Sequence, residues 1–344
     1  MAKKVRLGII GAGEAAGHHA VGYEHLKDIA EVTIVCDLDE EKAKDLADRL
    51  GVKTICSDYH RILDDKTIDA VDIMLPTHLH AKIVIEAAKQ KKHVLCEKPM
   101  GLSSVECQKM IDASKKAKII LMPVHNQIFY PSHKRAKEII DSGEIGIPQL
   151  YRTHRINSIA PPDECWRGKQ SESGGVLMEA GIHRIYTSEY LMGRIKKVIS
   201  SVKKSDERPG DIDTVCAILE FENGALGVFD FGVGVGGGFF SEDCTTIFGS
   251  NGLIHINGCE YPFFEEIPRL KINTQDGWRD EGIKDEDYSN SFIDLMKNFV
   301  NSVRGVAKTV VTAEDAKHII EIIEQITREK NPRLNLNHRL VIIT

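Results

Sequence analysis

The feature that most constrains the fold is a glycine turn near the amino end of the chain. A short apolar strand pattern, Val5–Ile10, runs directly into Gly11-Ala12-Gly13-Glu14-Ala15-Ala16, which opens a helical pattern. In this context the first glycine permits a tight turn, the second lets the backbone approach a pyrophosphate, and a small residue at the sixth position allows close helix packing, with free N–H groups facing the anion. The residues predicted to line the pyrophosphate are Gly11, Gly13, Glu14, Ala15 and Ala16.

Strand-like and helical patterns alternate from residue 3 to about residue 123. This alternation is typical of a parallel sheet. Asp39 is placed to cap a helix over 40–50, and Ser103 with Glu106 forms a capping box at the start of another. Residues 1–123 are therefore predicted to form a doubly wound α/β domain. Its predicted strands are Val5–Ile10, Val32–Asp37, Ala70–Leu75, His93–Cys96 and Ile119–Pro123.

The pattern changes after Pro123. A helix is predicted over Ser132–Ser142 and another over Val176–Leu191, and Asn223-Gly224 and Asn251-Gly252 mark tight hairpins. Residues 124–344 are therefore predicted to form an α+β domain with an open, mainly antiparallel sheet. Its predicted strands are Val198–Val202, Asp213–Phe221, Ala225–Phe231, Thr245–Phe248 and Leu253–Ile256, and its last two helices are Ser291–Arg304 and Thr312–Lys330.

The composition narrows the class of partner. The net charge is -6 over 344 residues, with acidic and basic residues interspersed, which argues against nucleic acid or an anionic membrane as the main partner. The first residues show neither the apolar stretch nor the cleavage site of a signal peptide, and no run reaches membrane-spanning length. The eight cysteines are scattered without a CxxC pair, as in a reducing compartment. We therefore expect a cytoplasmic protein that acts on small molecules.

Asp37 bears on the choice of cofactor. It ends the second predicted strand, close to the roughly 20-residue offset expected for the carboxylate that binds ribose hydroxyls. An acid at this point would repel a 2′-phosphate, and the following residues 38–41 include no arginine to receive one. NAD is therefore favoured over NADP. The alternative is that Asp37 only terminates the strand and caps a turn.

Three later motifs resemble the signatures of the Gfo/Idh/MocA oxidoreductases, which are named for glucose-fructose oxidoreductase and inositol dehydrogenase. They are Pro76-Thr77-His78-Leu79-His80, Cys96-Glu97-Lys98-Pro99-Met100 and the run GGVLMEAGIH over 174–183. The resemblance covers essentially the whole chain. It implies a Rossmann domain followed by an open-faced antiparallel sheet domain, with the active site between them. It also implies a homodimer or homotetramer formed through the sheet.

The resemblance also implies roles for individual residues. Lys98 matches the family's catalytic-site lysine and His183 its catalytic histidine. Glu179 stands where the family usually has Asp, which leaves the exact substrate open. The remaining matches, all near the cofactor, are Pro76, Thr77, His80, Glu97, Asn126, Trp166 and Arg167.

The expected chemistry fits these residue types. Oxidising a secondary alcohol requires a base at the hydroxyl while hydride moves to the nicotinamide, and histidine titrates near neutrality. We expect His183 to act as base and Lys98 to stabilise the developing alkoxide, although the reverse assignment is open. Glu179, four residues before His183, could orient the base on a shared helix face or bind a substrate hydroxyl. Nothing in the histidine spacing assembles a metal site, so none is expected.

The function favoured by these residues is an NAD-dependent dehydrogenase for a sugar, sugar derivative or cyclic polyol. One alternative is a redox-assisted glycoside hydrolase or lyase that retains NAD, as the resemblance allows. Another is a non-catalytic sensor that binds dinucleotide, but the presence of both Lys98 and His183 disfavours it.

Overall fold

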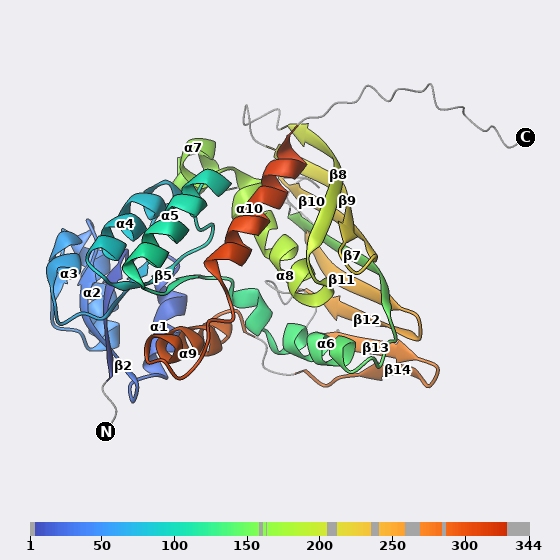
Figure 1. Ribbon diagram of the computed structural model, residues 1–344, viewed down its shortest axis with the longest axis horizontal. Helices are drawn as coiled ribbons and strands as arrows, with labels where there is room; N and C mark the ends of the chain where they lie inside the picture. Colours follow the sequence, from blue (N-terminus) through green and yellow to red (C-terminus); the bar gives the residue numbers. More distant parts are fainter. Residues whose placement is uncertain are drawn as a thin grey trace, which may run out of the picture.

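The structure is a computed structural model of the 344-residue chain. It describes residues 4–157, 161–162, 164–204, 212–234, 241–258, 269–283 and 287–328. Figure 1 shows a domain of mixed helices and strands on one side and a broad sheet on the other, with helices between them.

The first domain is built on a six-stranded parallel sheet in the order β3-β2-β1-β4-β5-β6. This is the doubly wound arrangement in which ligands bind beyond the carboxyl ends of the strands. The sequence predicted the parallel sheet but missed β3, which has only two residues and therefore no periodicity to detect. The strands are β1 (Val5–Ile10), β2 (Ala30–Cys36), β3 (Ile55–Cys56), β4 (Ala70–Ile73), β5 (His93–Cys96) and β6 (Leu121–Pro123).

Side-chain caps begin two helices of this domain as predicted, over 40–50 and 104–117. The Asp39 side chain accepts a hydrogen bond from Lys42 N at 3.3 Å, and the Ser103 side chain accepts one from Glu106 N at 3.2 Å. Within the described residues, no helix is long and apolar enough to cross a membrane. The helices are α1 (Ala16–Glu24), α2 (Glu40–Leu50), α3 (His60–Asp64), α4 (Thr77–Lys89) and α5 (Ser104–Ala117).

The second sheet has eight strands in the order β14-β13-β12-β11-β7-β10-β9-β8, all antiparallel except the β7–β10 pair. This confirms the mainly antiparallel prediction. Two strands at one edge, β13 and β14, were not predicted. The strands are β7 (Pro148–Asn157), β8 (Ile195–Lys204), β9 (Ile212–Phe221), β10 (Leu226–Val233), β11 (Ser241–Gly249), β12 (Gly252–Asn257), β13 (Leu270–Thr274) and β14 (Gly277–Asp280).

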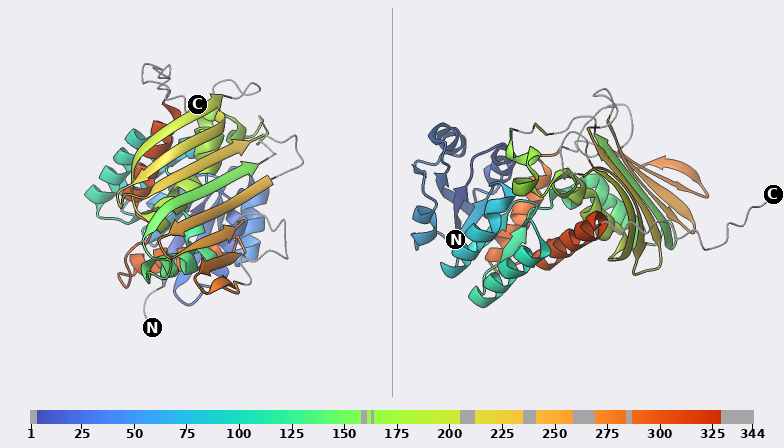
Figure 2. Two further views of the ribbon diagram at one scale, coloured as in Figure 1. Left: turned by 90° about the vertical axis from the view of Figure 1, so that its right-hand side faces the viewer. Right: turned by 90° about the horizontal axis from the view of Figure 1, so that it is seen from above.

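Helices cover one face of this sheet and leave the other open, as Figure 2 shows from two sides. The helix predicted over 176–191 is not regular, because its first turn is a π-helix, Leu177–Gly181, and α8 (Ile182–Met192) begins only after it. The other elements are the short η1 (Asn126–Phe129) and η2 (Trp166–Gly168), with α6 (Pro131–Asp141), α7 (Gln170–Ser173), α9 (Ser291–Val303) and α10 (Ala313–Thr327).

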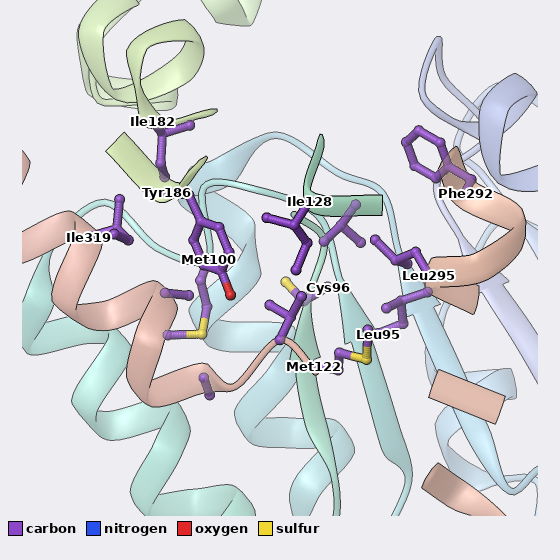
Figure 3. Close-up of a cluster of buried hydrophobic side chains, with 14 of the residues drawn as sticks. Leu95, Cys96, Met100, Met122, Ile128, Ile182, Tyr186, Phe292, Leu295 and Ile319 are labelled. Carbon is purple, nitrogen blue, oxygen red and sulfur yellow. The ribbon is translucent and has the colours of Figure 1, made fainter. Parts of the chain in front are cut away.

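The last two helices return to the first domain. Phe292 in α9 lies against His18 and His19 of α1, and Ser104 N at the start of α5 donates to Glu324 of α10 at 2.8 Å. Apolar side chains from both parts of the chain, among them Leu95, Met100, Tyr186 and Ile319, form one buried cluster (Figure 3). The division of the chain at residue 123 stays a prediction, since residues far beyond it complete the core of the first domain.

The contact between α1 and α9 is close enough to test with a pair of glycines. A Cβ on Gly22 would lie 2.3 Å from Met296 Sδ and 3.1 Å from Phe292 O, whereas a Cβ on Gly17 would meet only Arg49 Nη1 at 3.9 Å. Alanine favours a helix interior over glycine by about 1 kcal/mol, and overpacking a core costs roughly 1–3 kcal/mol. We expect Gly17→Ala to raise the free energy of unfolding and Gly22→Ala to lower it, as measured by urea denaturation. Equal effects would contradict this packing of α9.

Candidate active site

The glycine turn has the geometry that a pyrophosphate site requires. Gly11 has φ 102°, and a Cβ there would lie 2.3 Å from the backbone oxygen of Met74 in the neighbouring β4 segment, so only glycine fits. Around Gly13 there is nothing within 4 Å of an added Cβ. The N–H groups of Gly13, Glu14 and Ala15 have no acceptor in the described part of the chain. The first turn of α1 therefore presents open space and free donors, which fit a dinucleotide phosphate.

Asp37 is fixed by backbone donors. Its Oδ2 accepts a hydrogen bond from Ala12 N at 2.6 Å, and its Oδ1 accepts one from Asp39 N at 2.9 Å. The carboxylate thus caps a turn, as the alternative interpretation held. A carboxylate oxygen has two lone-pair sites, so each oxygen can still accept a hydroxyl. The two interpretations of Asp37 are compatible.

The loop between β4 and α4 lies at the same edge of the sheet. Pro76 caps α4, and the buried Thr77 hydroxyl has no hydrogen-bond partner in the described residues. The ring nitrogens of buried His80 lie 2.9 Å from Pro99 O and 2.7 Å from Leu75 O. His80 therefore ties this loop to the one that carries Lys98, while Thr77 keeps a free buried hydroxyl for a ligand.

Lys98 is the centre of the site. It lies two residues after the end of β5, and its peptide bond to Pro99 is cis. Its Nζ donates to Glu179 O at 2.8 Å and to Glu179 Oε1 at 3.0 Å. The Glu179 side chain also accepts from Arg167 Nε at 3.3 Å, and Arg167 Nη1 reaches Glu14 at 3.0 Å. A chain of alternating charge thus joins the sheet edge, the segment at 166–168 and the glycine turn.

The π-turn explains where Glu179 points. The helix is irregular over 177–181, directly before α8, and the prediction that Glu179 orients His183 along a shared helix face stays a prediction. The Glu179 carboxylate lies instead between the Lys98 and Arg167 cations. Burial would raise the pKa of this carboxyl, but the charge of Lys98, with Arg167 and Arg155, lowers it below its ordinary value. Glu179 is therefore an anion that holds Lys98.

His183 lies beside the same lysine and is buried. Its Nδ1 has no hydrogen-bond partner within the described residues. Burial lowers its pKa well below the ordinary value, and the charges of Lys98 and Arg155 lower it further. At neutral pH the imidazole is uncharged, which is the form that can accept a proton.

The other predicted residues have structural contacts. Asn126 Nδ2 donates to Ser291 Oγ at 2.9 Å and so joins the end of β6 to α9. The Trp166 ring lies 4.8 Å beneath the Arg167 guanidinium, an arrangement that holds the arginine toward Glu179.

Sequence reasoning missed His125. This residue is buried, its ring stacks on Tyr186 at 3.9 Å, and neither ring nitrogen has a partner in the described residues. Burial, with Lys98 nearby, lowers its pKa to about 3. Its place next to Asn126 was the only available signal. Arg155 in β7, to which no role was given, is also buried and acts electrostatically on Glu179 and His183.

Comparison with known proteins identifies the family. Residues 5–125 match the model described as "Oxidoreductase family, NAD-binding Rossmann fold", and residues 133–255 match the GFO/IDH/MocA C-terminal domain. The chain belongs to the Gfo/Idh/MocA oxidoreductases. The resemblance inferred from the three motifs is thereby confirmed, as are the Rossmann domain and the second, mainly antiparallel sheet domain.

Individual Gfo/Idh/MocA relatives extend over most of the chain. Myo-inositol 2-dehydrogenase of Thermotoga maritima is 31% identical over 325 residues, which cover 91% of this chain and 92% of the relative. A D-xylose 1-dehydrogenase (NADP(+)) of Haloferax volcanii is 31% identical over 57% of this chain and 59% of its own length. The structure of levoglucosan dehydrogenase with NADH and levoglucosan has a TM-score of 0.83 at 25% identity, covering 94% of this chain and 96% of the other.

The glycine turn can be tested through stability and binding together. Gly11→Ala places a Cβ against backbone and forces a positive φ, so we expect it to lower the free energy of unfolding by about 1–3 kcal/mol. Gly13→Ala meets no atom, so the free energy of unfolding should stay within about 0.5 kcal/mol of wild type. The added methyl group fills the space left for the phosphates, so affinity for the dinucleotide, measured by calorimetric titration, should fall about tenfold or more. Unchanged affinity in folded Gly13→Ala protein would place the phosphates elsewhere.

Proposed function

We propose that this chain is an NAD-dependent dehydrogenase that oxidises a secondary hydroxyl of a cyclic polyol, a sugar or a sugar derivative. The observation that carries the proposal is the partly buried Lys98–Glu179 ion pair, whose side chains are 12% and 14% exposed, beside the uncharged His183 at the carboxyl edge of the parallel sheet. A fixed cation next to a neutral imidazole is what an alcohol needs to lose its proton as hydride leaves. The names of the relatives, which include inositol and anhydrosugar dehydrogenases, support the substrate class.

The surroundings of Asp37 favour NAD over NADP. Two backbone N–H groups fix the carboxylate at the end of β2, beside the glycine turn. The nearby cation, Lys42, is already paired with Asp39 at 3.0 Å. A 2′-phosphate would therefore meet the negative charge of Asp37.

Each residue of the site has a separate role in the proposed reaction. When bound, the nicotinamide supplies the hydride acceptor. His183 takes the proton of the substrate hydroxyl at a ring nitrogen, since its depressed pKa keeps that nitrogen free. The Lys98 ammonium stabilises the negative charge that grows on the same oxygen, and Glu179 with Arg167 holds that ammonium in place.

A substrate panel tests the proposal. Purified protein with NAD or NADP is mixed with inositols, aldoses, sugar acids and anhydrosugars, and absorbance of the reduced nicotinamide is followed. We expect NADH to form with one group of substrates, and kcat to fall about 10²- to 10⁴-fold in His183→Ala and about 10²- to 10³-fold in Lys98→Ala. Lys169→Ala, an exposed lysine paired with Glu172 near the site, is the matched control and should keep wild-type kcat.

The panel also separates the remaining alternatives. No NADH from any substrate, with NAD still bound to the purified protein, would exclude the simple dehydrogenase. It would favour cleavage of a glycosidic bond through transient oxidation, or sensing. Full activity in Lys98→Ala and His183→Ala would contradict the assignment of these two residues.

We further propose that two copies of the chain meet through the open face of the second sheet. Ile199, Ile218 and Val228 lie side by side on β8, β9 and β10, and 57%, 51% and 37% of their respective surfaces are exposed. The face of the sheet that carries no helices is seen directly in Figure 2. A row of large apolar side chains on three neighbouring strands is typical of an interface.

Light scattering after size exclusion tests this interface. We expect a homodimer or homotetramer for the wild type and a smaller species for Ile218→Lys, because a charge is costly to bury in an apolar contact. Val306→Lys, at a 67% exposed residue outside the sheet, is the control and should leave the mass unchanged. A monomeric wild type would exclude the interface.

A further inference from the structure

A second polar cluster lies inside the first domain, behind the site. His19 and Tyr23 come from α1, Asp72 from β4, and Glu97 from the residue after β5. All four side chains are buried, and the exposed fraction of both His19 and Asp72 is 0%. Neither the glycine turn nor the proposed proton transfer uses His19 or Asp72. Their burial therefore needs a separate explanation.

The contacts of His19 fix its protonation. Nδ1 lies 2.8 Å from Asp72 Oδ2, and Nε2 lies 2.9 Å from Glu97 Oε1. A neutral imidazole carries one N–H, so one of these contacts would place two lone pairs against each other. A ring protonated on both nitrogens donates to both carboxylates. With Asp72 and Glu97 both ionised, the geometry therefore fits a buried histidinium between two anions.

The electrostatics agree with this geometry. Burial alone would lower the pKa of His19, but the charges and hydrogen bonds of Asp72 and Glu97 raise it to about 10. The Tyr23 phenol donates to Asp72 Oδ2 at 2.8 Å. The other titratable groups that act on this cluster include His18, His80, Cys96 and Lys98. A raised pKa means that the ring stays protonated below about pH 10, and so through the neutral range.

The histidinium is connected to the catalytic lysine. The second oxygen of Glu97, Oε2, accepts a hydrogen bond from the backbone N–H of Lys98 at 2.8 Å. Burial would raise the pKa of the Glu97 carboxyl, but His19, with Lys98, lowers it. The side chain of Lys98 then extends to Glu179. A connected series thus runs from Asp72 through His19 and Glu97 to the backbone N–H of Lys98, and from the Lys98 ammonium to Glu179.

We propose that His19 is a positioning residue for hydride transfer: its doubly protonated ring bridges Asp72 and Glu97 and so fixes the carboxylate that orients Lys98. Stability alone is a weak reason for this cluster, because desolvating buried charges costs about as much as their pairing returns. The buried charge of His19 has a function if it keeps the Glu97 carboxylate ionised next to Lys98. This inference rests on the proposed dehydrogenase function.

The test compares two substitutions on the same helix. In His19→Gln the amide cannot supply a positive charge, so Glu97 should lose its histidinium and Lys98 its alignment. We expect kcat to fall about 10- to 100-fold, as for other misalignments of a catalytic group, while NAD affinity stays within about threefold. The pKa of Glu97 should rise, so activity should be lost at higher pH than in wild type as the pH falls. His25→Gln, exposed at the end of α1, should match wild type in all three properties.

Two resonance measurements need no turnover. Histidine labelled with ¹⁵N in the wild type should show one ring, assigned by its loss in His19→Gln, protonated on both nitrogens at pH 8. In protein with ¹³C-labelled lysine, the ε-carbon resonance of Lys98 should move in His19→Gln and stay in His25→Gln.

The outcomes separate this inference from the proposed function. A singly protonated His19 ring, or a His19→Gln protein with wild-type kcat, pH profile and Lys98 resonance, would overturn the positioning role. A wild type inactive on every substrate would reject the dehydrogenase, and the two resonance measurements would still decide whether His19 positions Lys98. If His19→Gln does not fold, the ¹⁵N measurement on wild type, assigned instead by the loss of the signal in other histidine variants, decides the matter.

Discussion

The apolar packing at the carboxyl edge of the parallel sheet is the constraint on which the site depends. Side chains of β5 and β6 pack there against α8, α9 and α10 around Met100 and Tyr186 (Figure 3). Lys98 and Glu179 meet at the same edge, and their side chains are only 12% and 14% exposed. Electrostatic interactions between charges are much stronger in such surroundings than in water, so their placement has large effects.

The buried histidines of this chain differ in charge, because their neighbours differ. His183 and His125 lie near cations, so burial and charge act together and both rings are neutral. His19 lies between two carboxylates, which outweigh the effect of burial, and its ring is charged. Lys98 stands between these two kinds of imidazole. The protein thus keeps a proton acceptor on one side of the lysine and a fixed positive charge on the other.

Most of the correct predictions came from patterns among residues that are close together in the sequence. The glycine turn, the caps at Asp39 and Ser103, and the hairpin at Asn223 all depend on neighbouring residues, and all occur in the structure. The family motifs indicated that Lys98 and Glu179 belong to one site, but the ion pair between them was not predicted. The π-turn could not be predicted, because one extra residue in a helical turn hardly changes the apolar pattern that marks a helix.

The contacts that escaped prediction join distant parts of the chain. Arg167 reaches Glu14 across 153 positions, and His19 reaches Asp72 and Glu97 across 53 and 78. Such contacts depend on the final arrangement of the strands. The residues around each partner in the sequence give no sign of them. The charge state of His19 depends on that pairing as well, since an isolated histidine titrates near pH 6.5.

The position of α10 has a consequence for how the molecule can move. Glu324 binds Ser104 at the start of α5, and Ile326 O, two residues on, accepts from Ser200 in the second sheet at 3.0 Å. Helix α10 thus contacts both halves of the molecule, and α9 packs against α1 of the first domain. Within the described residues, the two halves are therefore connected by more than the single crossing of the chain from β6 to α6. Rotation of one half against the other would have to break the contacts of α10 with α5 and with β8.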